Sequence, residues 1–206
     1  MNSSFSGSLR LLALVLMVAP VLFSVSSFAG MSQEEVKAFS DYKIRALKGE
    51  VEAQSAVGDC YMNGEGVGQD FAQAVVWYQK AAESGDANAQ SELASCYSKG
   101  FGVEKNERIA LNWRLKAAKQ GHTIAQYNLG ITYLHGYGVP KDSVEAYAYL
   151  NLASASEIAS ITRRSKAALS DIESRMSRDD IALGQRRTRE LQAEIQANLD
   201  SKRTGK

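Results

Sequence analysis

A sequence pattern that recurs every 36 residues constrains the fold of this 206-residue chain more than any other feature. The segments AQSAVGDCYMNGEGV, AQSELASCYSKGFGV and AQYNLGITYLHGYGV occupy residues 53–67, 89–103 and 125–139. Each segment begins with Ala-Gln, contains a Tyr at the same place and ends with Gly-x-Gly-Val. Self-similarity at this period is typical of helical hairpins that stack in an array and bury a continuous core between neighbours.

The first half of each unit predicts a helix that ends in a glycine loop. In the first unit this helix is expected over about residues 50–62, and helical phase puts Gln54, Val57 and Tyr61 on one face. Gly64 follows the helix, at a place where a left-handed backbone conformation favours glycine. The rest of the loop extends the turn and supplies a Val that packs beneath it.

The second half of each unit predicts another helix. Asp70, Asn106 and Asp142 precede it, and these residue types can accept a hydrogen bond from a free N–H group of the first helical turn. The helix then presents alanines and large aromatic residues at repeating positions, such as Ala74 and Trp77 in the first unit. The alanines would let neighbouring helices approach closely, and the aromatic rings would fill the space between units.

The chain is therefore predicted to be all-α, an α-solenoid of three helix-turn-helix repeats closed by helices at both ends. Residues 30–49 keep the spacing of a second helix without a first, which predicts an N-terminal capping helix. Residues 158–206 are expected to form C-terminal capping helices and a basic tail, with Gly184 and Leu191 toward the last repeat and Arg187 facing away. The three repeats are expected over 50–85, 86–121 and 122–157.

Residues 1–29 are expected to be a signal peptide. Arg10 precedes the apolar run LLALVLMVAPVLF, and the segment Ser27 to Ala29 has small residues where a signal peptidase cleaves. Cleavage after Ala29 would export the chain, with the periplasm as the expected location and secretion as an alternative. A further alternative is an uncleaved N-terminal membrane anchor, because residues 11–29 are just long enough to span a bilayer.

The charge of the chain argues against a nucleic-acid partner. The formal net charge is +1, whereas nucleic-acid binding needs a concentrated basic field. Residues 30–162 hold 12 Lys or Arg and 16 Asp or Glu, and residues 163–206 hold 11 and 7. The basic tail is interpreted as a solvated helix face, with contact to an anionic lipid or polymer as the alternative. Membrane contact beyond export is not expected.

The repeated positions resemble Sel1-like repeats, relatives of the tetratricopeptide repeat. The resemblance rests on the pattern A-x-A-Q-x-x-L-G-x-x-Y-x-x-G-x-G-V followed by D-x-x-x-A-x-x-W-x-x-x-A-A-x-x-G, which three units follow over residues 50–157. Ala94 replaces the expected Gly in the second unit, and Tyr149 replaces the expected Trp in the third. The resemblance implies an α-solenoid and an adaptor role, often in envelope signalling, secretion or surface assembly among exported bacterial relatives.

No arrangement of residues predicts catalysis, a metal site or a cofactor. His122 and His135 are the only histidines and lie near opposite ends of one predicted helix, about 20 Å apart at 1.5 Å per residue. They cannot share a metal ion or a nucleophile. The sequence contains no G-x-S-x-G, H-E-x-x-H or phosphate-binding loop.

The two cysteines, Cys60 and Cys96, occupy the same position in successive units, where the third unit has Thr132. Equivalent residues on stacked helices are expected to be about 8–10 Å apart, whereas a disulfide wants Cα atoms within about 7 Å. Free thiols are therefore expected, and a disulfide remains the alternative for an exported chain. Some Sel1-like proteins carry a Cys pair within each unit, and this chain lacks the second Cys.

The face of each first helix opposite the core is expected to line a concave groove that binds a peptide or protein segment. The groove would grade from acidic, through Ser-rich, to apolar, and would suit a segment with an apolar anchor and a basic flank. The apolar end is either an open binding site or buried beneath the C-terminal helices. The candidate partner-binding residues are Glu52, Ser55, Asp59, Asn63, Ser91, Ser95, Lys99, Tyr127, Ile131 and Leu134.

The predicted function is that of an exported, non-enzymatic scaffold that binds another protein. Two alternatives remain at this point. One is an envelope hydrolase of the penicillin-binding or β-lactamase type, an activity proposed for some cysteine-rich relatives. The other is a structural part of a cell-surface machine.

Overall fold

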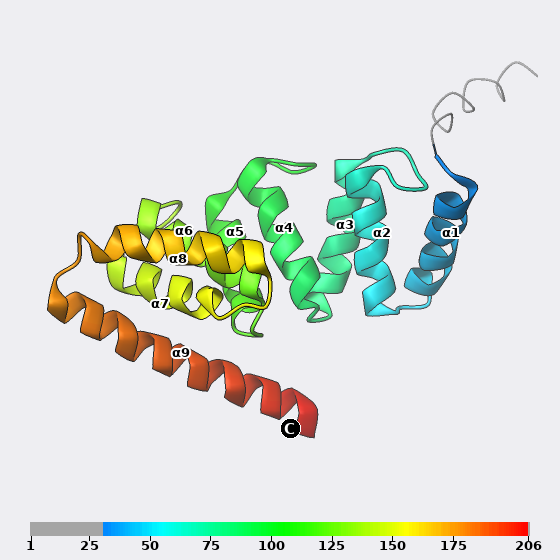
Figure 1. The fold of residues 1–206 in the computed structure, drawn as a ribbon. Helices are drawn as coiled ribbons and strands as arrows, with labels where there is room; N and C mark the ends of the chain where they lie inside the picture. Colours follow the sequence, from blue (N-terminus) through cyan, green and yellow to red (C-terminus); the bar gives the residue numbers. More distant parts are fainter. Residues whose placement is uncertain (1–30, 206) are drawn as a thin grey trace, which may run out of the picture.

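The computed structural model describes residues 31–205, and all regular elements within that range are α-helices (Figure 1). The expected signal peptide at 1–29 lies outside the described residues. The helices are α1 (Gln33–Leu47), α2 (Val51–Asn63), α3 (Phe71–Glu83), α4 (Ala87–Lys99), α5 (Glu107–Ala118), α6 (Thr123–His135), α7 (Ser143–Ser154), α8 (Ala159–Glu173) and α9 (Arg178–Thr204).

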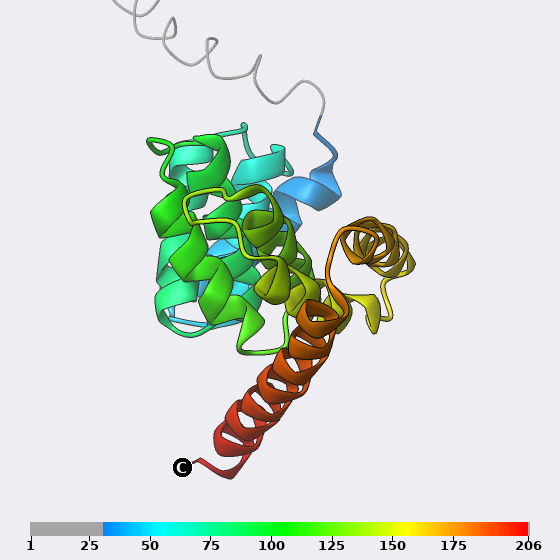
Figure 2. The ribbon, with the colours of Figure 1, turned by 90° about the vertical axis from the view of Figure 1, so that its left-hand side faces the viewer.

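The helices form three stacked hairpins, α2–α3, α4–α5 and α6–α7, which confirms the predicted all-α solenoid. Helix α1 packs against α2 at one end of the stack, and α8 and α9 pack against α7 at the other. In Figure 2, α9 runs along the outside of the body of repeats. The C-terminal helices therefore cover mainly the third hairpin, and α9 also reaches the end of α5, where Asn198 Nδ2 donates to the Lys119 carbonyl at 3.2 Å.

The helix boundaries follow from residues that recur in each unit. The side chains of Asp70, Asn106 and Asp142 accept hydrogen bonds from backbone N–H groups in the first turns of α3, α5 and α7, as predicted. Helices α2, α4 and α6 each end at a glycine in the left-handed conformation, with φ of 78°, 77° and 78° at Gly64, Gly100 and Gly136.

The second glycine of each loop brings the loop onto the preceding second helix, or onto α1 in the first unit. Gly66 and Gly102 have φ of 68° and 70°. A Cβ atom would lie 2.1 Å from the Glu35 carbonyl oxygen at Gly66, and 2.2 Å from the Phe71 carbonyl oxygen at Gly102. Both a positive φ and a close backbone contact therefore require glycine here, and this contact stacks one unit on the next.

The Ala94 departure from the family pattern is explained by the side chain opposite it. In the first hairpin a Cβ at Gly58 would lie 2.6 Å from the Tyr78 ring, and in the third a Cβ at Gly130 would lie 2.5 Å from Leu150. The equivalent of Tyr78 and Leu150 in the second hairpin is the unbranched Arg114. Its slender stem leaves room for an alanine methyl, which neither a ring nor a branched side chain would.

The Gln of each Ala-Gln pair ties its helix to the helix before it. Gln90 Nε2 donates to the Ala82 carbonyl of α3 at 3.0 Å, and the equivalent Gln54 and Gln126 donate to Ala46 and Ala118, each at 3.4 Å. These carbonyls lie in the last turns of α1, α3 and α5, where each also accepts from the backbone N–H group of the glycine that follows the helix. The repeated Gln is thus a structural residue that satisfies helix ends.

Helix α9 is held against α7 by a glycine contact and an ion pair. A Cβ at Gly184 would lie 2.6 Å from the Tyr147 ring, so the two helices meet closely there. Arg187 Nε lies 2.7 Å from Glu145 Oε1 on α7. The expectation that Arg187 faces away from the repeats is therefore wrong, because the length of its side chain lets it reach back to α7 from the edge of the apolar stripe.

Candidate functional site

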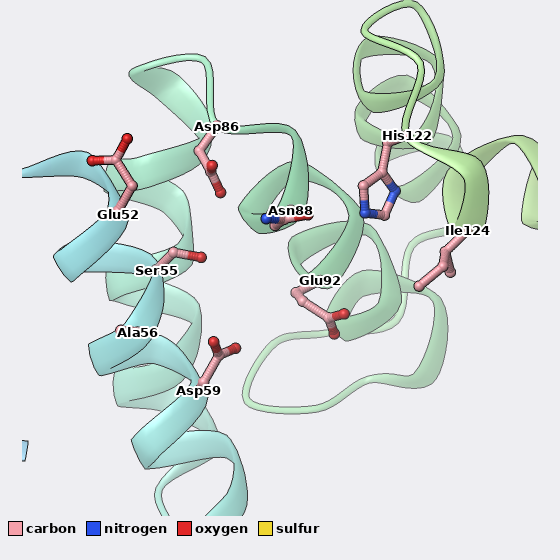
Figure 3. A pocket seen from close by; sticks show the side chains of 9 residues that line it. All are labelled: Glu52, Ser55, Ala56, Asp59, Asp86, Asn88, Glu92, His122 and Ile124. Carbon is pink, nitrogen blue, oxygen red and sulfur yellow. The ribbon is translucent and has the colours of Figure 1, made fainter. Parts of the chain in front are cut away.

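The principal candidate site is a pocket of about 310 Å³ on the face formed by α2, α4 and α6 (Figure 3). Helix α2 contributes Glu52, Ser55, Ala56 and Asp59, and the remaining lining residues come from α4, α6 and the residues that precede them. This pocket is called the acidic pocket below. Its full lining consists of Glu52, Ser55, Ala56, Asp59, Asp86, Asn88, Glu92, His122 and Ile124.

Negative charge dominates the acidic pocket. Glu52, Asp59, Asp86 and Glu92 line it, and none of the described lining residues is Lys or Arg. In Figure 3 the Asp59 carboxylate points from α2 into the space beside α4, and the Glu92 carboxylate extends from α4 toward the side of Ile124. A cationic group that entered this space would meet several carboxylates with no competing positive charge in the wall.

The two carboxylates at the bottom of the acidic pocket hold their protons more tightly than usual. Desolvation raises the pKa of Asp59 above its ordinary 3.8, with further contributions from Glu65 and Asp86, while a hydrogen bond from Tyr78 Oη (2.7 Å) opposes the rise. Desolvation and the charge of Asp59 raise the pKa of Glu92 above its ordinary 4.5. The repulsion between these carboxylates would be relieved by a bound cation.

The upper part of the pocket is formed by two helix caps. Asp86 Oδ1 accepts from Ala89 N at 2.6 Å, and His122 Nδ1 accepts from Ala125 N at 3.2 Å. A histidine can accept at Nδ1 only when that nitrogen is unprotonated, so this cap requires neutral His122. Burial lowers the pKa of His122 from its ordinary 6.5, against an opposing effect of Asp86.

The acidic pocket contains a Ser, a His and an Asp, but they are not joined as a catalytic triad. No hydrogen bond connects any two of Ser55, His122 and Asp86 within the described residues, and Nδ1 of His122 is occupied by its cap. Nucleophilic catalysis needs a base that contacts the nucleophile and a third group that orients the base. The described side chains instead form a polar, mainly acidic surface.

Among residues 31–205, no group of three or more His, Cys, Asp or Glu side chains is placed to hold a metal ion. Across the same range, no helix combines the length and the apolar character needed to cross a membrane.

Three of the predicted groove residues, Glu52, Ser55 and Asp59, line the acidic pocket. Sequence reasoning missed Glu92 and His122. Glu92 lies next to the predicted residue Ser91 on α4, and Ser91 itself is only 2% exposed and does not line the pocket. His122 was considered only as a metal ligand or catalytic partner and excluded as such, so its position at the rim of a pocket was not predicted.

The other polar candidates lie outside the acidic pocket. Ser95 is half-buried, and its hydroxyl donates to the Ser91 carbonyl of its own helix at 3.1 Å. Asn63 donates to Glu65 in the adjacent loop at 3.2 Å. The Lys99 ammonium lies 5.5 Å from the centre of the Phe101 ring, over the loop that follows α4. These three residues therefore make local contacts within their own helix or with the loop that follows it.

The apolar candidates Tyr127, Ile131 and Leu134 pack beneath the C-terminal helices. They are half-buried and join a cluster with Leu169 and Ile172 of α8. Of the two predicted alternatives for the apolar end, the structure shows burial under the C-terminal helices. The physical reason is that α8 presents an apolar face of its own, so the two faces remove each other from water.

The cysteines are separate and buried. Cys60 and Cys96 both carry free thiols, 6% and 1% exposed. Desolvation raises the pKa of each thiol from its ordinary 9.0 to about 11. Because the thiolate is the reactive form, these residues act as small apolar fillers of the repeat rather than as nucleophiles.

Comparison with known proteins gives a family and two structural relatives. Residues 51–86, 87–122 and 123–157 each match the Sel1 repeat.

A protective antigen of uropathogenic Escherichia coli with an SLR fold is 27% identical at a TM-score of 0.72, over 84% of this chain and 36% of that one. A Sel1 repeat protein from Oxalobacter formigenes is 36% identical at a TM-score of 0.53, over 58% of this chain and 46% of that one. The chain thus spans less than half of either relative. A comparison with curated proteins found no match.

Proposed function

Because the chain belongs to the Sel1 repeat family, whose members generally serve as scaffolds for protein–protein interaction, we propose that it is a non-catalytic adaptor that binds a protein segment along α2, α4 and α6. The observation that carries the proposal is the acidic pocket. Its charged walls and its place across three successive first helices suit an extended segment that inserts a basic side chain.

The proposed anchor is a Lys or Arg side chain of the partner. Asp59 and Glu92 line the pocket from neighbouring helices, and desolvation raises the pKa of each, so their ionised forms would gain from charge compensation. A guanidinium or ammonium group would supply that compensation through charge-assisted hydrogen bonds. The apolar anchor expected near Ile131 is not part of this proposal, because α8 covers that end.

We also propose that the chain acts outside the cytoplasm, in the periplasm, where envelope signalling, secretion or surface assembly would be its setting. This proposal is supported by the signal-like sequence of residues 1–29. Mass spectrometry of the chain from envelope fractions should find an N-terminus close to Gly30. A chain that keeps Met1 in the membrane fraction would contradict export with cleavage.

A site-specific photo-crosslinker tests the proposed interaction face in cells. Asn88 is exposed and lines the acidic pocket, whereas Gln73 is exposed on α3, away from it. A crosslinker at Asn88 should capture a defined protein from the envelope, and the same group at Gln73 should not. Asp59→Asn in the Asn88 background should reduce the capture. Equal capture from both positions, or none from Asn88, would contradict the proposal.

A further inference from the structure

A second pocket, of about 420 Å³, lies where α9 passes the end of α7 and the turn between α5 and α6. All the side chains that line it are uncharged, and most can form hydrogen bonds. This pocket is distinct from the acidic pocket, with which it shares no lining residue. Its hydrogen-bonding residues are Gln126, Asn151, Ser154, Thr188, Gln192 and Gln196.

Gln126 presents an acceptor to this pocket from an almost fully buried side chain. The residue is 4% exposed, and its Nε2 donates to the Ala118 carbonyl at 3.4 Å. Its Oε1 accepts no hydrogen bond from any described residue, although the side chain lines the pocket. Because this carboxamide oxygen lacks a partner, a hydrogen bond from an N–H donor that reaches it would be favourable.

The second repeat shows which group satisfies this acceptor. There the equivalent Gln90 also donates to a helix-end carbonyl, and its Oε1 accepts from Gln120 Nε2 at 2.7 Å. Gln120 lies 30 residues after Gln90, and 30 residues after Gln126 the chain has Ser156. The shorter Ser156 side chain instead accepts from Ile158 N at 3.0 Å. The third repeat therefore lacks the carboxamide that completes the second.

The first repeat provides the contrasting case. Gln54 has Ser84 at the position of Gln120, and Gln54 Oε1 is fully enclosed with no partner. That acceptor cannot be reached from outside. Only in the third repeat do the missing carboxamide and an accessible pocket coincide within the described residues, because α9 crosses there in place of a fourth repeat.

Asn151 supplies a second polar contact within the pocket. Its Nδ2 donates to Thr188 Oγ1 at 3.5 Å, while its Oδ1 accepts nothing from the described residues. Thr188 in turn donates its hydroxyl to the Gly184 carbonyl at 2.9 Å, which fixes its orientation. The pocket thus offers two acceptors that need N–H donors, with the carboxamide of Gln192 at the rim as an adjustable donor or acceptor.

We propose that this pocket binds a primary carboxamide, the side chain of a Gln in a partner protein segment. The NH₂ group donates to Gln126 Oε1, as Gln120 does to Gln90 within the second repeat, and the carboxamide oxygen accepts from the pocket rim. A carboxylate has no N–H to donate, and bringing its charge into an uncharged pocket is unfavourable. The pocket therefore distinguishes Gln from Glu.

NMR titration of the full chain tests this inference with two probes that differ in one group. The probes are acetyl-glutamine methylamide and acetyl-glutamate methylamide. The Gln probe should cause saturable shifts of the Gln126 and Asn151 side-chain amide signals, and the Glu probe should bind at least tenfold more weakly. Shifts of equal size with both probes, or no saturable shift at Gln126, would overturn the proposal. Saturable shifts with N-acetylglucosamine, in the absence of saturable shifts with the Gln probe, would also overturn the proposal.

Two variants keep the test independent of protein stability. Ala155 lines the pocket and is exposed, so Ala155→Trp should block entry and abolish the shifts at Gln126. Ser156→Gln introduces the residue type found at the equivalent position of the second repeat. Its own carboxamide should donate to Gln126 Oε1 and so reduce the affinity for the probe. Full probe affinity in both folded variants would overturn the proposal. Asp59→Asn in the acidic pocket should leave the titration unchanged, which separates this site from the proposed function.

Discussion

The first and third hairpins have the same backbone arrangement, but their inner faces, formed by α2 and α6, differ in chemical character. Asp59 on α2 and Ile131 on α6 occupy equivalent positions 72 residues apart. Asp59 lines an open acidic pocket, whereas Ile131 lies in an apolar cluster with residues of α8. The comparison shows that the repeated residues build the hairpin, while the residues that vary between units decide whether a face stays open or is covered.

The second helices of the two hairpins reinforce this difference. Tyr78 crosses under α2 beside Gly58 and ends in a hydroxyl that donates to Asp59. Leu150 makes the equivalent crossing beside Gly130 but has no polar end. The first hairpin can therefore support a charged residue on its inner face. The third gains more from the apolar side chains that α8 brings.

The largest expected effect concerns the aromatic positions that all three units share. Trp77 is 4% exposed and Tyr149 is 3% exposed, whereas Trp113 is half-buried with the Lys116 ammonium 3.9 Å from its ring centre. Trp77→Ala should lower the free energy of unfolding by about 3–5 kcal/mol. Trp113→Ala, which the sequence alone would place in the same range, should cost clearly less. Urea unfolding of both variants checks the order, and equal losses would contradict it.

Loop glycines sharpen the comparison at the contacts between units. A Cβ at Gly102 would meet the backbone of Phe71, but a Cβ at Gly138 would meet first the side chain of Glu107, at 2.8 Å. Gly102→Ala should cost about 1–3 kcal/mol for the overlap in addition to about 1–2 kcal/mol for the left-handed backbone. Gly138→Ala should cost less, because a side chain moves more easily than a helix backbone.

Gly85→Ala is the control for this pair. Gly85 has φ of 94° and nothing within 4 Å of a Cβ, so only the backbone conformation contributes. Thermal unfolding of the three variants should rank Gly102→Ala as most destabilised, then Gly138→Ala, then Gly85→Ala. A Gly85 variant as unstable as the Gly102 variant would show that stacking contacts do not matter.

Substitutions at the equivalent positions 59 and 131 test the contrast itself. Ile131→Ala should lower stability by about 1–3 kcal/mol, because it removes a half-buried apolar side chain from the contact with α8. Asp59→Asn should leave stability unchanged or slightly higher, because Asn keeps an acceptor for Tyr78 and loses the repulsion with its acidic neighbours. Chemical denaturation distinguishes these outcomes, and a large loss from Asp59→Asn would contradict the account of the open face.

The smallest expected effect is a pH dependence at the His122 cap. Folding lowers the pKa of His122, so its contribution to stability is present above the ordinary value of 6.5 and is lost as the pH falls through the range below it. His122→Asn keeps a capping side chain that does not titrate. As the pH falls, the free energy of unfolding of wild type should therefore decrease relative to that of the His122→Asn variant. A difference that stays constant with pH would show that His122 does not titrate as described.

Asp59 and Glu92 act with the opposite sign in the same pocket. Their pKa values are raised by folding, so each contributes an unfavourable term at neutral pH that disappears as the pH falls through the folded-state pKa. The comparison of His122→Asn with wild type cancels this contribution, because both proteins keep the two carboxylates.

The repeated part of the fold could be predicted from the sequence because each local signal occurs three times in phase. The caps at Asp70 and Gly64, and the all-α solenoid they define, are local consequences of residue chemistry. The burial of Ile131 under α8 could be raised only as one of two alternatives, because α8 belongs to no repeat and its packing partner is set by tertiary structure. To predict that Glu92 lines the pocket, the rotation of α4 about its axis must be known to within one residue. The apolar periodicity of the sequence does not fix it that closely.

The most direct test of the central claim is titration of a lysine-rich peptide against wild type and the two matched variants. The control peptide replaces each Lys with norleucine. Wild type should bind the Lys peptide and not the control, and the affinity should fall with added salt. Asp59→Asn should weaken binding by about tenfold, the equivalent of about 1.4 kcal/mol, while Ile131→Ala, although less stable, should bind as wild type does. Unchanged affinity in Asp59→Asn together with a loss in folded Ile131→Ala would contradict the assignment of an open first face and a covered third.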